Sequence, residues 1–206
     1  QWTGGVGLIV TAIAVLPLLQ IGGMQLFHLE SSKYSEERVF PRMTQVLRFI
    51  GLIYLGLSIA CATSYWLGGM SPFDAVVHMM STVSTGGFGT SDKSFAKWDS
   101  AALDFSAIIF MFLGSLPILL LWAAVRGKPG ALLGDSQVRA FALITMAAIA
   151  VMTAFLWHNG IVDNWRSFRY AAFTSVSVIT GSGFVNTDYG LLGPFASAFI
   201  VVIALI

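Results

Sequence analysis

The sequence predicts an all-α membrane protein built from repeated units, each a helix, a re-entrant pore loop and a second helix. Three observations predict this fold class: an apolar composition, long charge-free stretches and an internal repeat. Hydrophobic residues make up 56% of the 206 residues and charged residues 10%, with a mean hydropathy of +0.80. A soluble domain needs about a quarter of its residues charged, so lipid must cover much of this chain. The composition, with a net charge of +1, excludes a disordered or nucleic-acid-binding protein.

Four charge-free stretches are long enough to cross a membrane. A charged side chain at mid-membrane costs about 2.5 to 3.5 kcal/mol, and about 20 helical residues span the roughly 30 Å of hydrocarbon. We therefore expect spanning helices within Trp2–Leu29, Phe49–Phe73, Phe105–Val125 and Ala140–Val162.

Two other stretches, Ala75–Ser91 and Tyr170–Thr187, are shorter and carry Ser, Thr and Gly near their ends. They are expected to re-enter the membrane rather than cross it. A last apolar run, Tyr189–Ile206, stops without a charge or cap, and the opening at Gln1 has no Met and no basic flank. We therefore expect a fragment cut inside a helix, with no identifiable signal peptide.

The basic residues predict the orientation, because cytoplasmic loops carry the excess of Lys and Arg. The segments His28–Arg48 and Arg126–Arg139 hold seven Lys or Arg residues, and the opposite side holds four: Lys93, Lys97, Arg166 and Arg169. The loops 30–48 and 126–139 are therefore expected in the cytoplasm, and both re-entrant segments on the outer side. Interfacial anchoring is the simplest role for these basic side chains.

The internal repeat has an offset of 96 residues. Ser81–Asp92 aligns with Ser177–Asp188, so that Gly87 and Phe88 fall on Gly183 and Phe184. Each copy follows a spanning helix that ends in an aromatic-glycine turn. Parallel repeats around an axis along the membrane normal build a pore or a midplane site.

The first re-entrant segment begins with a helix-start pattern, Ser71-Pro72-Phe73-Asp74. Ser71 can cap, Pro72 suits the first helical position, and Asp74 favours the positive end of the helix dipole. We expect a short helix from Pro72 to about Ser84, which is too short to cross. Its negative end would point toward mid-membrane, where it stabilises a cation.

The chain must then return outward through a glycine-rich stretch, and the second segment repeats this plan. There Asp163 or Asn164 is the candidate cap, and the helix is expected to run to about Val178. Backbone carbonyls that lack helical partners at membrane depth must face protein or water, and rings of such carbonyls replace the hydration shell of potassium. Neither loop has a carboxylate at its narrow part, which favours a carbonyl filter for a monovalent cation over a calcium-type ring.

Other chemistry-bearing residues have simpler interpretations. Cys61 is expected to be a small core residue and His78 a packed or water-bonded histidine. Asp104 either lines the outer mouth or favours a helix dipole, and Asp92 and Asp188 either attract cations or cap the following helices. No Ser-His-acid arrangement and no paired carboxylates sit at membrane depth, so we expect neither an enzyme nor a cofactor.

The motifs give the chain a specific resemblance. It resembles the TrkH, KtrB and HKT superfamily of potassium transporters, and most closely bacterial TrkH. The residues that carry the resemblance are Thr-Gly-Gly-Phe at Thr85–Phe88, Gly-Phe at Gly183 and Phe184, the opening Gln1–Gly7, and Gly-Gly-Met-Gln-Leu at Gly22–Leu26.

The resemblance implies four units in one polypeptide, arranged with pseudo-fourfold symmetry around one pore. By that register, residues 1–29 hold the second helix of unit one, and 41–126 form unit two with its pore loop at 72–92. Residues 136–206 form a truncated unit three with its pore loop at 163–188. The family's gate, an intramembrane loop in the second helix of unit three, would start beyond Ile206.

The resemblance also implies which groups bind the transported potassium. They are the backbone carbonyls of Thr85, Gly86, Gly87, Phe88, Gly181, Ser182, Gly183 and Phe184, with Thr180 as a further candidate. The two strands differ, because Thr85 can add a hydroxyl where the repeat has Gly181. We therefore expect moderate discrimination of potassium from sodium.

Partners and location follow from the resemblance as well. It implies a homodimer embedded in lipid in the bacterial plasma (inner) membrane, with a cytoplasmic nucleotide-binding regulatory subunit similar to TrkA. Two other functions stay open: a secondary transporter whose broken helices couple a substrate to protons or sodium, and a purely structural membrane subunit.

Overall fold

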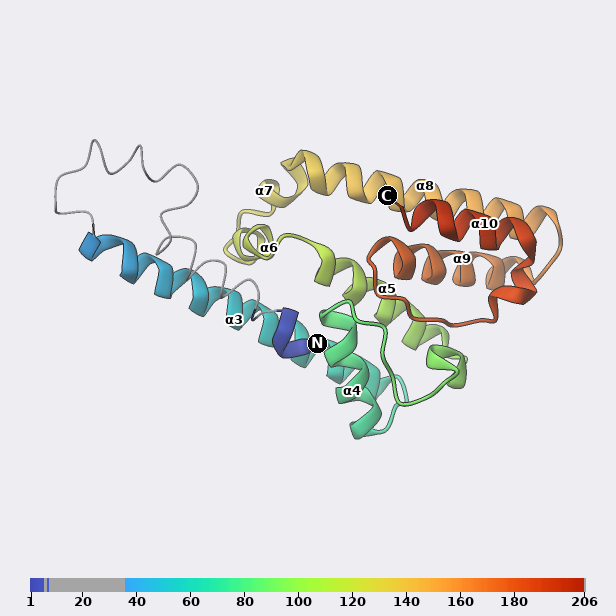
Figure 1. The fold of residues 1–206 in the computed structure, drawn as a ribbon, viewed down its shortest axis with the longest axis horizontal. Helices are drawn as coiled ribbons and strands as arrows, with labels where there is room; N and C mark the ends of the chain where they lie inside the picture. Colours follow the sequence, from blue (N-terminus) through green and yellow to red (C-terminus); the bar gives the residue numbers. More distant parts are fainter. Residues whose placement is uncertain (6, 8–35, 206) are drawn as a thin grey trace.

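The computed structural model describes residues 1–5, 7 and 36–205, and all regular structure within these residues is helical (Figure 1). The elements in chain order are α3 (Glu36–Leu67), α4 (Pro72–Val83), the 3-10 helix η1 (Ser94–Lys97), α5 (Ala101–Ser115), α6 (Ile118–Val125), α7 (Pro129–Gly134), α8 (Ser136–His158), α9 (Asn164–Ile179), the 3-10 helix η2 (Tyr189–Leu192) and α10 (Gly193–Ile203). The all-α prediction is confirmed for the described residues. Of the predicted span Trp2–Leu29, only residues 2–5 and 7 are described, and they are helical. The rest of that span, with the Gly22–Leu26 motif, lies outside the described residues.

Helices α3 and α8 have the length and composition of membrane spans. The apolar part of α3, Arg48–Leu67, has 20 residues and α8 has 23, which at 1.5 Å per residue gives about 30 and 35 Å. Each is followed by a glycine with positive φ, Gly69 at +104° and Gly160 at +59°. These are the aromatic-glycine turns that the sequence predicts.

The predicted boundaries of α3 shift at both ends. The span expected to reach Phe73 ends at Leu67, because the glycine turn stops the helix before α4 begins. At its other end α3 begins at Glu36, so residues 36–48 of the predicted cytoplasmic loop are helical, and residues 30–35 lie outside the described residues. The loop 126–139 contains the short helix α7 and the first turn of α8.

The predicted third span, Phe105–Val125, is not one continuous helix. It divides into α5 and α6, whose axes differ in direction by 107°. Pro117 causes the break, because it has no N–H for the helical ladder and disfavours helical geometry in the residue before it. Leu116 accordingly is extended, with φ −78° and ψ 151°. The described residues thus contain two helices fit to cross a membrane, or three if α5 and α6 form one bent span.

The two predicted re-entrant helices are present with nearly the expected ends. Helix α4 has 12 residues and α9 has 16, or about 18 and 24 Å. Ser71 caps α4 by accepting a hydrogen bond from the Asp74 N–H at 3.1 Å. Asp163 occupies the equivalent cap position of α9 but its side chain makes no capping bond.

Helix α5 joins the two halves of the molecule. It packs against α3 and α4 on one side and against α9 on another, while α9 also packs against α8 and α10. Figure 1 shows the short helices α4 and α9 on either side of α5. A buried cluster centred on Phe95 contains residues from both halves, among them Tyr65, Phe173 and Phe184. The loops that follow α4 and α9 are therefore held against one common core.

Candidate ion-binding site

The two loops after the short helices repeat the same backbone shape. The first loop is residues 84–93, between α4 and η1, and the second is residues 180–188, between α9 and η2. Thr85 and Gly87 have φ of +50° and +73°, and their repeat equivalents Gly181 and Gly183 have +72° and +73°. These left-handed conformations favour glycine. The sequence repeat is thus also a conformational repeat, with Thr85 as the strained member.

Equivalent hydrogen bonds close the ends of both short helices. The Thr85 N–H donates to the Thr82 carbonyl at 3.1 Å, and the Gly181 N–H donates to the Val178 carbonyl at 3.0 Å. These bonds end the helical ladder at matching positions. Beyond them the chain turns away, so the following carbonyls leave the helical pattern.

A serine on each short helix then binds the loop in opposite ways. In the first loop the Phe88 N–H donates to Ser81 Oγ at 2.7 Å. In the second loop Ser177 Oγ donates to the Phe184 carbonyl at 2.8 Å. Among the predicted filter carbonyls, that of Phe184 therefore has a protein donor from α9.

The structure brings the two predicted filter stretches into contact. A Cβ added at Gly87 would collide with the backbone carbonyl oxygen of Ser182. Further along, the Ala96 N–H donates to the Val185 carbonyl at 3.3 Å, and the Val185 N–H donates to Ser94 Oγ at 3.2 Å. The stretches 85–88 and 181–184 are therefore neighbours, and η1 binds the residue that follows the second stretch.

The opening residues also lie against the first loop. A Cβ at Gly86 would collide with the Gln1 side chain. Trp2 Nε1 donates to Ser58 Oγ at 3.0 Å, and the Tyr54 hydroxyl donates to the Trp2 carbonyl at 3.0 Å. Sequence reasoning used these opening residues only as part of a family motif and gave no signal for their contact with the loop.

Asp74 anchors the part of the first loop that leads to η1. Its carboxylate accepts hydrogen bonds from the Thr90 and Ser71 hydroxyls and lies 3.8 Å from Lys97 Nζ. The Thr90 hydrogen bond, then the Ser71 bond and the nearby Lys97 charge, hold the pKa of Asp74 below its usual range. The sequence predicted only a helix-dipole role for this residue.

The rings of Phe95 and His78 pack against residues of the second and the first loop. The Phe95 ring centroid lies 5.0 Å from that of Phe184 and 5.5 Å from that of His78. His78 is fully buried, its Nδ1 is 2.8 Å from the Asp74 carbonyl, and Gly89 packs so closely that a Cβ there would lie 2.5 Å from Nε2. The prediction of a packed histidine is confirmed. Among the described residues no group of three or more His, Cys, Asp or Glu could hold a metal ion.

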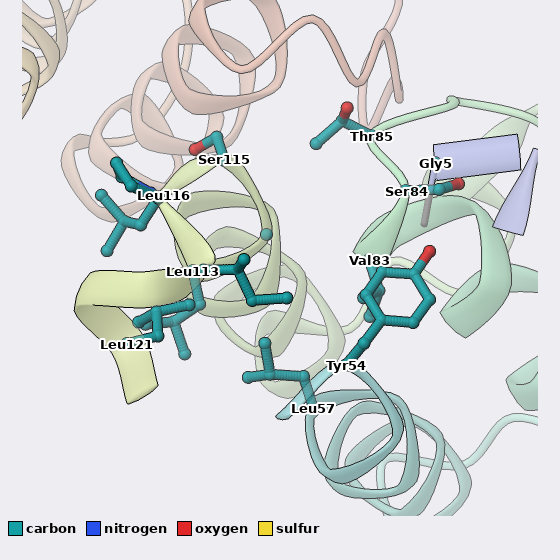
Figure 2. Close-up of a pocket in the computed structure, with 13 residues that line it drawn as sticks. Gly5, Tyr54, Leu57, Val83, Ser84, Thr85, Leu113, Ser115, Leu116 and Leu121 are labelled. Carbon is teal, nitrogen blue, oxygen red and sulfur yellow. The ribbon is translucent and has the colours of Figure 1, made fainter. Parts of the chain in front are cut away.

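A cavity of about 370 Å³ lies at the inner end of the first loop (Figure 2). Val83, Ser84 and Thr85 line it from the end of α4, and Leu113–Ile118 line it from the α5–α6 break. Most of the residues that line the cavity are apolar, and the cavity lies beside the negative end of α4.

One of the two roles predicted for Asp104, lining an outer mouth, is wrong. It lies in the first turn of α5 but is only 1% exposed, with Oδ2 2.8 Å from Arg169 Nε and 2.7 Å from Asn186 Nδ2. Arg169, expected at the interface, is buried with it.

Asp188 accepts a hydrogen bond from the Gly190 N–H at 2.8 Å, so its capping role is confirmed. Asp92 is exposed, and its role in attracting cations stays a prediction.

Known proteins resemble this chain in both sequence and structure. Residues 1–206 match the protein family described as TrkH, cation transport protein. Similar proteins include the Trk system potassium uptake proteins TrkI of Halomonas elongata, 41% identical over 95% of this chain, and TrkH of Vibrio parahaemolyticus, 37% identical over 92% of it. The crystal structure of the potassium transporter TrkH from Vibrio parahaemolyticus matches 98% of the chain with a TM-score of 0.82 and 33% identity.

The chain spans only part of these relatives. It covers 40% of TrkI and of TrkH, and 41% of the chain in the crystal structure.

Proposed function

Because this chain belongs to the TrkH family of cation transport proteins, as its motifs predict, we propose that its two loops form part of a potassium-uptake pore. The stretches 85–88 and 181–184 would each supply one strand of a four-stranded selectivity filter. Their backbone carbonyls would replace the hydration shell of the ion, and the ion would move by electrodiffusion.

The contact between Gly87 and the Ser182 carbonyl carries this proposal. It joins Gly87 to the residue before Gly183, its repeat equivalent, and both glycines have positive φ. A filter requires carbonyl-bearing strands of one conformation close to a common axis. The left-handed positions support the shared conformation, and the close approach of Gly87 to the second loop supports the proximity of the two strands.

The cavity below Thr85 supports the same function. Ion conduction needs a place for a hydrated cation before or after the narrow part. The end of α4 borders the cavity and supplies the partial negative charge of its last carbonyls. Thr85, the first residue of that strand, lines this cavity, so its hydroxyl can contribute to an inner ion site.

The two strands differ, and we expect the pore to be only partly selective. The Phe184 carbonyl accepts a bond from Ser177, and Gly181 lacks the hydroxyl of Thr85. An ion between the strands would therefore meet an uneven ring of ligands. Reversal potentials in mixed potassium and sodium test this expectation, and discrimination as sharp as that of a dedicated potassium channel would contradict it.

Complementation provides the test of transport. A full-length protein that contains this chain should restore growth of potassium-uptake-deficient cells at low potassium, and Gly87→Ser and Gly183→Ser should each lose that ability. Purified protein in liposomes should pass potassium down its electrochemical gradient. A wild-type protein that inserts but passes no potassium would contradict the proposal.

A secondary transporter is the second candidate, and the α5–α6 break favours it. Broken helices that line a midplane cavity are a feature of such transporters. This alternative predicts saturable flux coupled to protons or sodium. Potassium flux that follows only the potassium gradient, unchanged by imposed proton or sodium gradients, would exclude it.

Assembly and location belong to the same proposal. The apolar spans and the transporter relatives indicate a membrane protein. We propose that it lies in the bacterial inner membrane as a homodimer, with both loops toward the outside. The cytoplasmic side would bind a nucleotide-binding regulatory subunit similar to TrkA.

A further inference from the structure

A buried charged cluster holds the second loop against α5 and α9. Its members are Asp104 on α5, Arg169 on α9 and Asn186 in the second loop, and they are 1%, 6% and 4% exposed. Asp104 Oδ2 accepts from both Arg169 Nε, at 2.8 Å, and Asn186 Nδ2, at 2.7 Å. One carboxylate oxygen therefore holds a pore helix and a loop at the same time.

Stabilisation of the fold alone does not explain why the cluster is charged. Burying an ion pair costs so much desolvation that well-packed apolar residues often stabilise a protein equally well or better. The desolvation is also incompletely offset, because Asp104 Oδ1 and Asn186 Oδ1 are buried without a hydrogen-bond partner among the described residues. What the cluster does supply is fixed geometry, since hydrogen bonds to a charged group are short and directional.

The geometry that it fixes is that of the second predicted filter strand. Asn186 lies two residues beyond Phe184, and Val185 between them is bonded to Ser94 and Ala96. The outer end of this strand is thus attached to the preceding unit by a side chain and by the backbone. The first loop differs, because its outer end is attached to Asp74 of its own pore helix.

The guanidinium adds a second link. Arg169 Nη2 lies 2.9 Å from Asp99 Oδ1, just before α5, while its Nε binds Asp104. Arg169 therefore fixes α9 to both ends of one short segment of the preceding unit. A shift of this segment would move α9 and the loop together.

We propose that Asp104 and Arg169 are positioning residues that set the outer end of the second filter strand, and through it the discrimination of potassium from sodium. The inference rests on the proposed pore. A carbonyl ring discriminates between ions by the number and placement of its oxygens. Loosening one strand should therefore reduce selectivity more than it reduces conduction.

The test compares Asp104→Asn, Arg169→Gln and Asn186→Ala in the full-length protein reconstituted in liposomes. The control is Arg166→Gln, because Arg166 is one turn earlier on α9 and exposed. The measurement is the potassium-to-sodium permeability ratio from reversal potentials. We expect the ratio to fall about tenfold in the three cluster variants, as for loss of a hydrogen bond to a charged group, and to be unchanged in the control.

The possible outcomes distinguish a failure of this inference from a failure of the proposed function. A wild-type protein without potassium flux contradicts the pore itself. Wild-type flux with an unchanged ratio in correctly inserted cluster variants overturns only the positioning role, and shows that the cluster serves folding alone. If the charge variants do not insert, Asn186→Ala decides, because it removes only a neutral amide and leaves the ion pair intact.

Discussion

The two loops share a backbone but not an environment. Positive φ angles recur at equivalent positions, yet Phe88 of the first loop is 70% exposed and the equivalent Phe184 is fully buried. The first loop is bonded to Asp74 of α4, the helix that precedes it, and the second is bonded to Asp104 of α5. A repeated sequence thus repeats the local conformation, while the neighbours decide how firmly each copy is held.

The largest expected effect comes from adding a methyl group at the equivalent glycines. At position 87 an alanine would have to adopt a positive φ, and its Cβ would also collide with the Ser182 carbonyl oxygen. At position 183 an alanine would only have to adopt a positive φ, because nothing lies within 4 Å of its Cβ. We expect potassium uptake to be abolished by the first and reduced by the second, with a strain of about 1 to 2 kcal/mol at each left-handed position.

Gly127→Ala is the matched control for these two variants. Gly127 has φ of +82° and open space around its Cβ, but it lies in the loop 126–139. It should reproduce the backbone strain with normal uptake. Equal losses of uptake in all three variants would show that strain alone, and not the contact between the loops, matters.

The next effect concerns the two serines that bind the loops. Ser177→Ala removes the donor to the buried Phe184 carbonyl, which should cost about 1 to 3 kcal/mol. Ser81→Ala removes the acceptor for the Phe88 N–H, which is only partly buried, so water can replace it and the cost should be smaller. Thermal unfolding of both variants in detergent measures the difference, and a larger loss for Ser81→Ala would reverse our comparison.

A smaller effect is expected from making the loops alike at their inner ends. Thr85→Gly removes the strain of a β-branched residue at φ +50°, about 1 to 2 kcal/mol, which offsets the roughly 0.5 to 1 kcal/mol entropic cost of glycine. The relief of strain is the larger of the two, so stability should rise slightly, by about 0.5 to 1 kcal/mol. The potassium-to-sodium permeability ratio should fall slightly because one hydroxyl is lost, and a rise would contradict an ion-binding role for Thr85.

The smallest effect is the pH dependence of the first loop's anchor. Because the folded-state pKa of Asp74 is lowered, its contribution to stability is present above the unfolded pKa of about 3.9. That contribution is lost as the pH falls through the lower folded value. The difference in thermal stability between wild type and Asp74→Asn should therefore be the same at every pH between about 5 and 8. A difference that changes within that range would contradict the assignment.

Local chemistry made much of the fold predictable. The Ser71 cap, the proline at position 72 and the glycine turns act within a few residues, so the sequence alone indicates α4 and the turns that follow α3 and α8. The break at Pro117 had a local signal too. Charge-free length alone predicts one span over Phe105–Val125, because it does not register the proline inside that stretch.

The parts that could not be predicted depend on long-range contacts. The Asp104–Arg169 bond joins residues 65 positions apart, and charge counting alone placed Arg169 at the membrane interface. The repeat predicted that the two loops adopt one shape, but not that Ser182 would lie against Gly87. Nor did it indicate that Ser81 and Ser177 would bind their loops in opposite directions.

The most direct test of the filter is to locate the ion. Anomalous diffraction from crystals of the full-length protein soaked in rubidium should place density between the stretches 85–88 and 181–184. The account predicts this density within coordination distance of backbone carbonyls from both stretches. Rubidium density that avoids both stretches, in a protein that transports potassium, would contradict it.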